Sequence, residues 1–150
     1  MTADASTPPA GPRDTTHPAL APRIIVVAAV VEEGDAFLVS RRQAGVHLAG
    51  LWEFPGGKID PGETHEEALR REMGEELDTD VEVGELVFEV EHTYPERTVA
   101  LFFYRCRLRG RPRPLLGQDV RWVARGDLAT LGFPPADEEL ITRLTSPAAR

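Results

Sequence analysis

Residues 56–77 constrain the fold of this chain more than any other segment. The glycines and prolines of residues 55–63 predict a loop with little regular structure. Thr64 is followed three residues later by Glu67, a capping-box signature that predicts the start of a helix. An apolar stripe predicts that this helix continues to Leu77; its residues are Ala68, Leu69, Met73 and Leu77. The segment therefore predicts a loop followed by a helix that buries one face.

The net charge of −8 is concentrated in the same region. Residues 60–80 contain nine acidic residues and two arginines, which gives a local charge of −7. A chain this acidic should not bind nucleic acid polymers through a broad basic face. A dense group of carboxylates can bind hard divalent cations instead.

Three glutamates of the predicted helix share one face. At about 100° per residue, Glu76 lies roughly 40° from Glu72, and Glu75 lies roughly 60° to the other side. Like charges at this spacing cost a few tenths of a kcal/mol in an isolated helix, so stability alone would not favour them. Mg²⁺ prefers oxygen ligands and completes its coordination with water and substrate phosphates. The spacing fits such a site, but it also fits a solvated acidic face.

Gly74 is an unusual residue for the middle of this helix. Glycine costs about 1 kcal/mol there relative to alanine. We therefore expect a neighbouring segment to approach the helix closely at this point.

The remaining chain predicts one α+β domain built around a mixed sheet. The expected strands are residues 24–31, 36–41, 81–94, 98–108 and 120–124, and the expected second helix is residues 138–144. The first four strands are expected to form two hairpins. At 150 residues the chain can bury one core. We expect a domain over residues 23–146, a disordered tail over 1–22 and a frayed end over 147–150.

Composition also predicts a compartment. Cys106 is the one cysteine, so no internal disulfide can form. The longest apolar run is residues 24–31, whereas a membrane-spanning helix needs roughly 20 residues. Residues 1–22 contain two aspartates and five prolines and lack the pattern of an export signal. We therefore expect a cytoplasmic protein without a membrane partner.

Residues 57–79 resemble the Nudix box, G-x5-E-x7-R-E-U-x-E-E-x-G-U, in which U is a bulky aliphatic residue. The positions in register are Gly57, Glu63, Arg71, Glu72, Met73, Glu75 and Glu76. Two positions depart from the pattern, because Asp78 stands at the box glycine and Thr79 at the last aliphatic position. These departures concern the exit of the helix far more than the expected metal ligands.

Further motifs are similar to the MutT-like branch of the Nudix family, the nucleotide-pool sanitising phosphohydrolases. They are Ser40-Arg41-Arg42, His47, Glu53-Phe54-Pro55-Gly56-Gly57, Pro95-Glu96-Arg97, Gly117-Gln118, Trp122 and Phe133-Pro134-Pro135-Ala136-Asp137. The resemblance implies a Nudix fold, in which a mixed sheet is sandwiched between helices and the box forms a loop-helix-loop. It also implies hydrolysis of a nucleoside triphosphate to a monophosphate and pyrophosphate, with oxidised dGTP as the first substrate to test.

The resemblance implies a role for each matching residue of the box. The implied metal ligands are Glu72, Glu75, Glu76 and the carbonyl of Gly56, and the implied metal is Mg²⁺, with Mn²⁺ as an alternative. Arg71 would orient the glutamates during catalysis. Gly57 and Glu63 would lie next to the metal ligands without binding the metal.

Substrate recognition would involve Arg42, Arg97 and Asp137. Arg42 would contact the phosphates, although a solvated strand arginine fits its position equally well. Asp137 stands where the bacterial MutT pattern has asparagine. If ionised, it would accept hydrogen bonds from the N1–H and N2–H₂ of a guanine edge; if protonated, it would fit a cytosine edge. An aspartate at this position could also cap the following helix.

Leu116 stands where MutT-like enzymes carry a further glutamate that is proposed to help activate water. The general base is therefore unassigned, and we interpret the nearby Asp119 as an ordinary loop carboxylate. The alternative substrates are cytidine triphosphates, nucleotide sugars and dinucleoside polyphosphates. A nucleotide-binding sensor with weak catalysis is a further alternative. The oligomeric state, monomer or homodimer, is open.

Overall fold

A computed structural model describes residues 23–45 and 48–146 of the chain. The expected tail over 1–22, the expected frayed end over 147–150 and His47 lie outside the described residues. Within the described part, no helix is both long enough and apolar enough to cross a membrane.

The described chain forms a seven-stranded sheet and two α-helices. In chain order these elements are β1 (Arg23–Glu33), β2 (Ala36–Arg41), β3 (Trp52–Glu53), β4 (Gly56–Lys58), α1 (His65–Leu77), β5 (Val81–Tyr94), β6 (Arg97–Leu108), β7 (Val120–Ala124) and α2 (Glu138–Thr145). Two short 3₁₀ helices, η1 (Arg125–Thr130) and η2 (Pro135–Asp137), lie between β7 and α2. The predicted strands, hairpins and helices are all present, with bounds that differ by a few residues.

β1 is the central strand of the sheet. It pairs in parallel with β6 and antiparallel with both β2 and β4. β5 continues the sheet beyond β6, while β3 and β7 pair with β2. Because parallel and antiparallel pairs occur together, the predicted mixed sheet and α+β class are confirmed.

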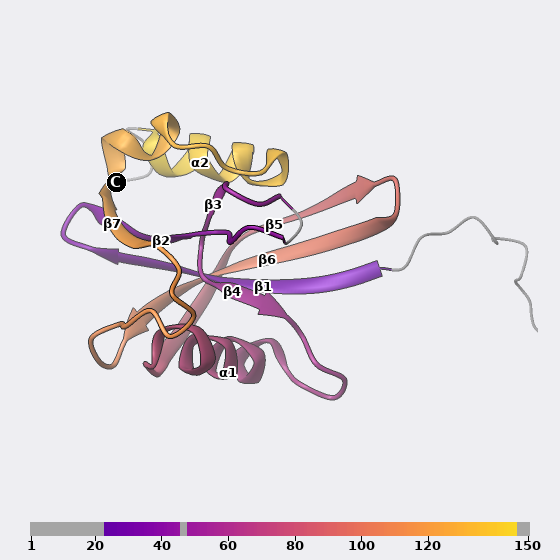
Figure 1. The fold of residues 1–150 in the computed structure, drawn as a ribbon, viewed down its shortest axis with the longest axis horizontal. Helices are drawn as coiled ribbons and strands as arrows, with labels where there is room; N and C mark the ends of the chain where they lie inside the picture. Colours follow the sequence, from indigo (N-terminus) through magenta and orange to yellow (C-terminus); the bar gives the residue numbers. More distant parts are fainter. Residues whose placement is uncertain (1–22, 46–47, 147–150) are drawn as a thin grey trace, which may run out of the picture.

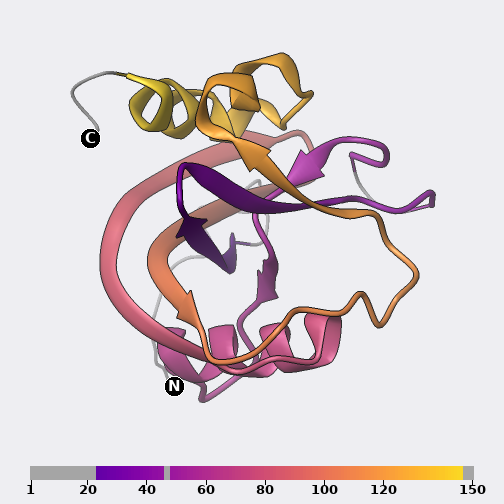
Figure 2. The same ribbon diagram turned by 90° about the vertical axis from the view of Figure 1, so that its left-hand side faces the viewer.

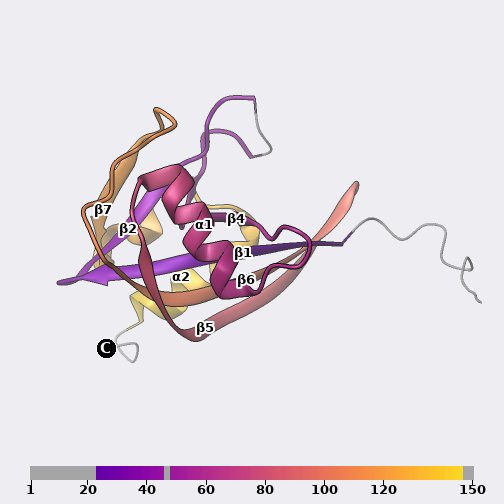
Figure 3. The same ribbon diagram turned by 90° about the horizontal axis from the view of Figure 1, so that it is seen from below.

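The two helical layers cover opposite sides of the sheet (Figure 1). Figure 2 shows β5 and β6 curving from the layer of α1 to the layer of α2, and Figure 3 shows α1 crossing the sheet. Successive side chains of a strand point to opposite faces, so β1 is buried on both. Val27 and Val31 pack with Leu69 and Met73 of α1, whereas Val30 packs in the cluster that contains Leu140 of α2.

Both ends of α1 are capped by side chains or backbone of the predicted segment. The Thr64 side chain accepts the N–H of Glu67, and the Glu67 side chain accepts the N–H of Thr64, so the predicted capping box is confirmed. Asp78 ends the helix in the left-handed conformation with φ of 55°, and its N–H donates to the Gly74 carbonyl. Aspartate adopts this conformation more readily than most residues. The helix therefore ends normally although Asp78 replaces the box glycine.

Residues 55–63 have little regular structure, as predicted, apart from the three residues of β4, which pair with β1. One sequence prediction about this region was wrong. Gly74 marks no close approach, since a methyl group built there would have no heavy atom within 4 Å outside its own helix and chain neighbours.

Candidate active site

A pocket of about 310 Å³ opens between β1, β4, β6 and α1. Acidic residues line one end: Glu53, Glu72 and Glu76. Tyr94, Arg97 and Asp137 line another part, and Val26, Leu101 and Phe103 are among its apolar lining residues. We call this cavity the main pocket. It combines charged groups with enough apolar surface to hold an organic ligand.

Glu72 and Glu76 of α1 lie within hydrogen-bond reach of each other in the main pocket. Burial raises the pKa of both carboxyl groups, and the charges of Glu72 and Glu53 raise the pKa of Glu76 further. Two carboxylates this close must share a proton or a cation. This carboxylate pair is therefore chemically suited to a divalent metal ion, which would replace the shared proton.

The two glycines of β4 allow the carboxylate pair to lie against the backbone. A Cβ at Gly57 would stand 2.5 Å from Cδ of Glu72 and would overlap its carboxylate oxygens. A Cβ at Gly56 would collide with the backbone of β1, and the N–H of Gly56 hydrogen-bonds to Glu76. Both positions thus require glycine for close approach.

Arg71 is the centre of an ion-pair network beside the pair. Its guanidinium donates to both carboxylate oxygens of Glu63 at 2.6 and 3.0 Å and to Glu72 at 3.2 Å. It also donates to the carbonyl of Lys58 at 3.0 Å, which ties α1 to β4. The hydrogen bond from Arg71 holds the pKa of Glu63 below its usual value. Arg71 thus holds the carboxylate of Glu72 while it is itself held by Glu63 and by the Lys58 carbonyl.

Glu75 is more exposed than Glu72 and shares the Nη1 donor of Arg71 with it. Its side chain is 60% exposed and accepts a hydrogen bond from Arg71 at 3.2 Å. Within residues 23–45 and 48–146, no three His, Cys, Asp or Glu side chains are already gathered as a metal site. The structure thus brings Glu72 and Glu76 within hydrogen-bond reach of each other, whereas Glu75, the residue next to Glu76, is linked to Glu72 through Arg71.

Arg42 and Glu53 form an ion pair at the acidic end of the main pocket. The Nη1 of Arg42 lies 2.6 Å from Oε1 of Glu53, and both side chains are 28% exposed. Burial raises the pKa of Glu53, and Arg42 opposes that effect. Glu53 had no predicted role, although it belongs to the motif Glu53-Phe54-Pro55-Gly56-Gly57 and stands four residues before the box glycine. That motif was the signal that could have singled it out.

Asp137 also lines the main pocket and is buried, with 3% of its surface exposed. Its Oδ1 has no hydrogen-bond partner among the described residues, and its side chain does not cap α2. Burial and the charge of Glu53 raise the pKa of Asp137 to about 7, against the opposing effect of Arg42. A buried acceptor without a partner is costly, so this carboxyl group is available for a ligand.

Tyr94 is a second residue without an assigned role in the sequence analysis. It ends β5, lines the main pocket, and has its pKa raised by burial and by the charge of Asp137. Arg97 begins β6 across the hairpin turn and lines the same pocket. The hairpin end therefore supplies one aromatic and one cationic side chain near Asp137.

Leu116 lines a second, smaller cavity on the other side of Glu76. This cavity has a volume of about 140 Å³ and also includes Glu53 and Arg42 in its lining. Leu116 thus lines the same cavity as Glu53 and Glu76 but supplies no carboxylate there. Asp119 instead pairs with Arg121 at 3.3 Å, as an ordinary loop carboxylate would.

Comparison with known proteins gives a consistent family assignment. Residues 26–143 match the family described as "NUDIX domain". The chain is 36% identical over 121 residues to an 8-oxo-dGTP diphosphatase of Escherichia coli (strain K12), covering 80% of this chain and 94% of that protein. It is 42% identical over 119 residues to a CTP pyrophosphohydrolase of the same strain, covering 79% and 88%.

A solved structure agrees with these relatives. The solution structure of the E. coli ORF135 protein superimposes with a TM-score of 0.72 at 32% identity, covering 81% of this chain and 88% of that one. The Nudix fold expected from the box is thereby confirmed. The family match spans the sheet, α1 and most of α2. From its box, its fold and its relatives, the chain belongs to the Nudix family of hydrolases.

Proposed function

We propose that this chain is a Mg²⁺-dependent hydrolase that cleaves a nucleoside triphosphate to a nucleoside monophosphate and pyrophosphate. The observation that carries the proposal is one pocket lined both by Glu72 and Glu76 and by Asp137, whose buried Oδ1 has no hydrogen-bond partner among the described residues. The relatives named as a diphosphatase and a pyrophosphohydrolase support the same reaction.

The proposed metal ligands are Glu72, Glu75, Glu76 and the carbonyl of Gly56. Hydrolases of this family generally use a divalent metal, and the hard oxygen donors favour Mg²⁺, with Mn²⁺ as the alternative. When bound, the metal would neutralise charge on the phosphates and lower the pKa of bound water. Glu75 would have to leave Arg71 to join the other two glutamates. Arg71 would still hold Glu72 through its other donors.

In the proposed reaction, the oxygen of one water molecule forms a bond to a phosphorus, and the bridging bond between the α- and β-phosphates breaks. The water gives up one proton, and the leaving phosphate takes the electron pair of the broken bond. Glu53 is the candidate acceptor for that proton, because its carboxylate lies beside Glu76 and Arg42. Its assignment would fill the role that Leu116 leaves open.

Asp137, Arg97 and Arg42 are the proposed substrate-binding residues. The named relatives act on a guanine nucleotide and on a cytosine nucleotide. An ionised Asp137 would accept from the guanine edge, and a protonated Asp137 would offer cytosine one donor and one acceptor. A pKa near 7 makes both forms accessible at neutral pH. We therefore propose 8-oxo-dGTP and CTP as the two leading substrates.

The test is a panel of nucleotides assayed with Mg²⁺ for release of pyrophosphate and monophosphate. The panel contains 8-oxo-dGTP, dGTP, CTP, dCTP, an ADP-sugar and a dinucleoside polyphosphate. The triphosphates should be cleaved fastest. Rapid cleavage of the ADP-sugar with inert triphosphates would contradict the proposal, and tight nucleotide binding without turnover would favour a sensor.

Three matched variants distinguish the effect of losing a metal ligand from the effect of lowering the negative charge of α1. Glu75→Gln and Glu76→Gln should each lower kcat by about 100-fold or more. Glu66→Gln removes an equal charge from the first turn of the same helix and should leave kcat unchanged. Equal losses in all three variants would mean that α1 acts only through its overall charge.

A further inference from the structure

Glu76 separates two cavities. It lines the main pocket together with Glu72, and it lines the second cavity together with Ser40, Arg41, Gln43, Leu116 and Gln118. Arg42 and Glu53 also line both cavities. The two cavities therefore adjoin at these three side chains.

The second cavity is lined largely by groups that bind anions. Arg41 has a guanidinium with five N–H donors, of which its bond to the carbonyl of Gly50 uses one. Gln43, Gln118 and Ser40 add neutral donors to the lining. Arginine and amide donors together suit phosphate oxygens, which accept several hydrogen bonds at once.

The wall of this cavity is fixed by hydrogen bonds to α1. The carbonyl of Glu76 accepts from the N–H of Leu115 at 3.0 Å and from Nε2 of Gln118 at 3.1 Å. Gln43, which follows β2 in the chain, donates from Nε2 to the carbonyl of Leu116 at 2.7 Å. The loop that closes the cavity is thus held to the same helix that carries the proposed metal ligands.

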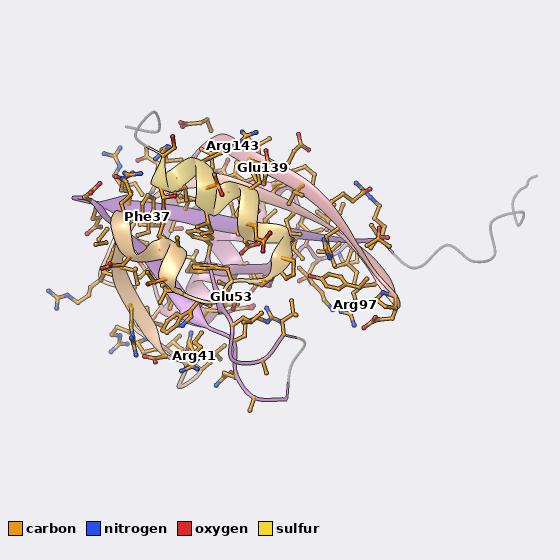
Figure 4. The ribbon with its side chains drawn as sticks, turned by 90° about the horizontal axis from the view of Figure 1, so that it is seen from above. Phe37, Arg41, Glu53, Arg97, Glu139 and Arg143 are labelled. Atoms are coloured by element: carbon orange, nitrogen blue, oxygen red, sulfur yellow. The ribbon has the colours of Figure 1, made fainter. Side chains whose placement is uncertain are left out.

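The two cavities differ in what they can hold. The apolar lining residues Val26, Leu101 and Phe103, together with Asp137, belong to the main pocket, which suits a nucleobase. The second cavity has about 140 Å³ and a mainly polar lining, which suits a small anion. In the view of Figure 4, Arg97 of the main pocket lies to the right of Glu53, and Arg41 of the second cavity lies below Glu53.

We infer that the second cavity binds the terminal two phosphates of the substrate and retains them as pyrophosphate after cleavage, with Arg41 and Gln43 as ligands. This inference rests on the proposed function and adds the site of the leaving group. With the nucleoside in the main pocket, the α–β bridge lies beside Glu76. The bond that breaks is then the one that spans the two cavities, which explains why the products would be a monophosphate and pyrophosphate.

The charge balance of the second cavity agrees with this assignment. Arg42 and Glu53, which both line the cavity, pair with each other, so Arg41 supplies a further cation that adds to a metal at Glu76 in balancing the charge of an incoming anion. Arg41 also lies over the ring of Trp52, with its Cζ 5.8 Å from the centroid. This packing limits the motion of the guanidinium and positions it at the rim.

The test is calorimetric titration of the full chain, in Mg²⁺, with inorganic pyrophosphate and separately with dGMP and CMP. Arg41→Ala should weaken pyrophosphate binding about tenfold and Gln43→Ala about threefold, as expected for losing a charged and a neutral hydrogen bond. Binding of the monophosphates should change by less than about twofold in either variant. In the hydrolysis assay, both variants should raise KM for the triphosphate.

Arg121→Ala is the matched control. Arg121 also lies over Trp52, at 5.0 Å, but it does not line the second cavity. The inference is wrong if Arg121→Ala weakens pyrophosphate binding as much as Arg41→Ala, or if Arg41→Ala and Gln43→Ala both bind it like wild type. If the wild type cleaves no triphosphate, yet pyrophosphate binding depends on Arg41 and Gln43, then the proposed function fails and this anion site stands.

Discussion

Replacing Asp137 by asparagine should make the chain more stable at alkaline pH. The wild-type carboxyl group is 3% exposed and has an unpartnered oxygen, so its ionised form is poorly solvated in the folded state. The pKa rises from 3.8 to about 7 on folding. A shift of about three units corresponds to about 4 kcal/mol at 1.36 kcal/mol per unit, as an upper figure.

The sign of the effect follows from proton binding. Between pH 4 and 7 the folded state holds more protons on Asp137 than the unfolded state, so raising the pH favours unfolding. Wild-type stability contributed by this group is fully present below about pH 4 and is lost as the pH rises through about 7. Asparagine has nearly the same shape and does not ionise. Asp137→Asn should therefore match wild type near pH 4 and exceed its free energy of unfolding by up to about 4 kcal/mol at pH 8.

The measurement is urea unfolding of both proteins from pH 4 to pH 8, without metal or nucleotide. The difference in free energy of unfolding between the two proteins reports the effect of Asp137, because all other ionisable groups are present in both. Asp119→Asn is the matched control, since it removes a carboxylate from an exposed loop ion pair instead of a buried one. A difference for Asp137→Asn that is the same at pH 4 and pH 8 would refute the reasoning.

Three further predictions concern catalysis, stability and selectivity. Gly57→Ala should lower kcat about 100-fold, because the new methyl group would displace the carboxylate of Glu72; an unchanged rate would show that this carboxylate need not lie against β4. Gly74→Ala should raise the free energy of urea unfolding by about 1 kcal/mol, since the added methyl group meets no neighbour; a loss of stability would contradict that. The ratio of kcat/KM for guanine over cytosine triphosphates should fall about tenfold or more from pH 8 to pH 6, as Asp137 gains a proton, and a constant ratio would mean that Asp137 does not select the base.

The features that the sequence predicted well are those decided by neighbours along the chain. The capping box joins Thr64 and Glu67, and the buried stripe of α1 repeats within one helix. Both hairpins have short turns between strongly strand-like runs. Local chemistry and periodicity are sufficient for such elements.

The features it missed depend on residues far apart in the chain. β4 is only three residues long and exists because Gly56 and Gly57 can lie against β1, about 30 residues earlier. Glu53 and Tyr94 reach the main pocket because strand pairing brings their strands to it. Helix periodicity placed Glu75 beside the other two glutamates but could not give the direction of its carboxylate, which Arg71 determines.

Buried Arg125 is a further example of a long-range effect. It follows β7 in η1, and only 5% of its surface is exposed. Its guanidinium contacts Asp35 at 2.7 Å, Glu32, and the carbonyl of Leu144 at 2.6 Å. The sequence carries no sign of these contacts, since the partners lie 90 and 93 residues before it and 19 residues after it.

The parallel pairing of β1 with β6 sets the order in which this enzyme can fold. The pairing joins Arg23 to Thr98 and continues to Val31 and Cys106, so each pair is 75 residues apart. Contacts of such separation form slowly, because a long loop must close before any of them is made. During synthesis, β1 and α1, the helix with the proposed metal ligands, leave the ribosome before β6 does. The main pocket can form only after β6 has emerged, because residues of β6 line it. The acidic residues of α1 are therefore synthesised well before the strand that completes the pocket around them.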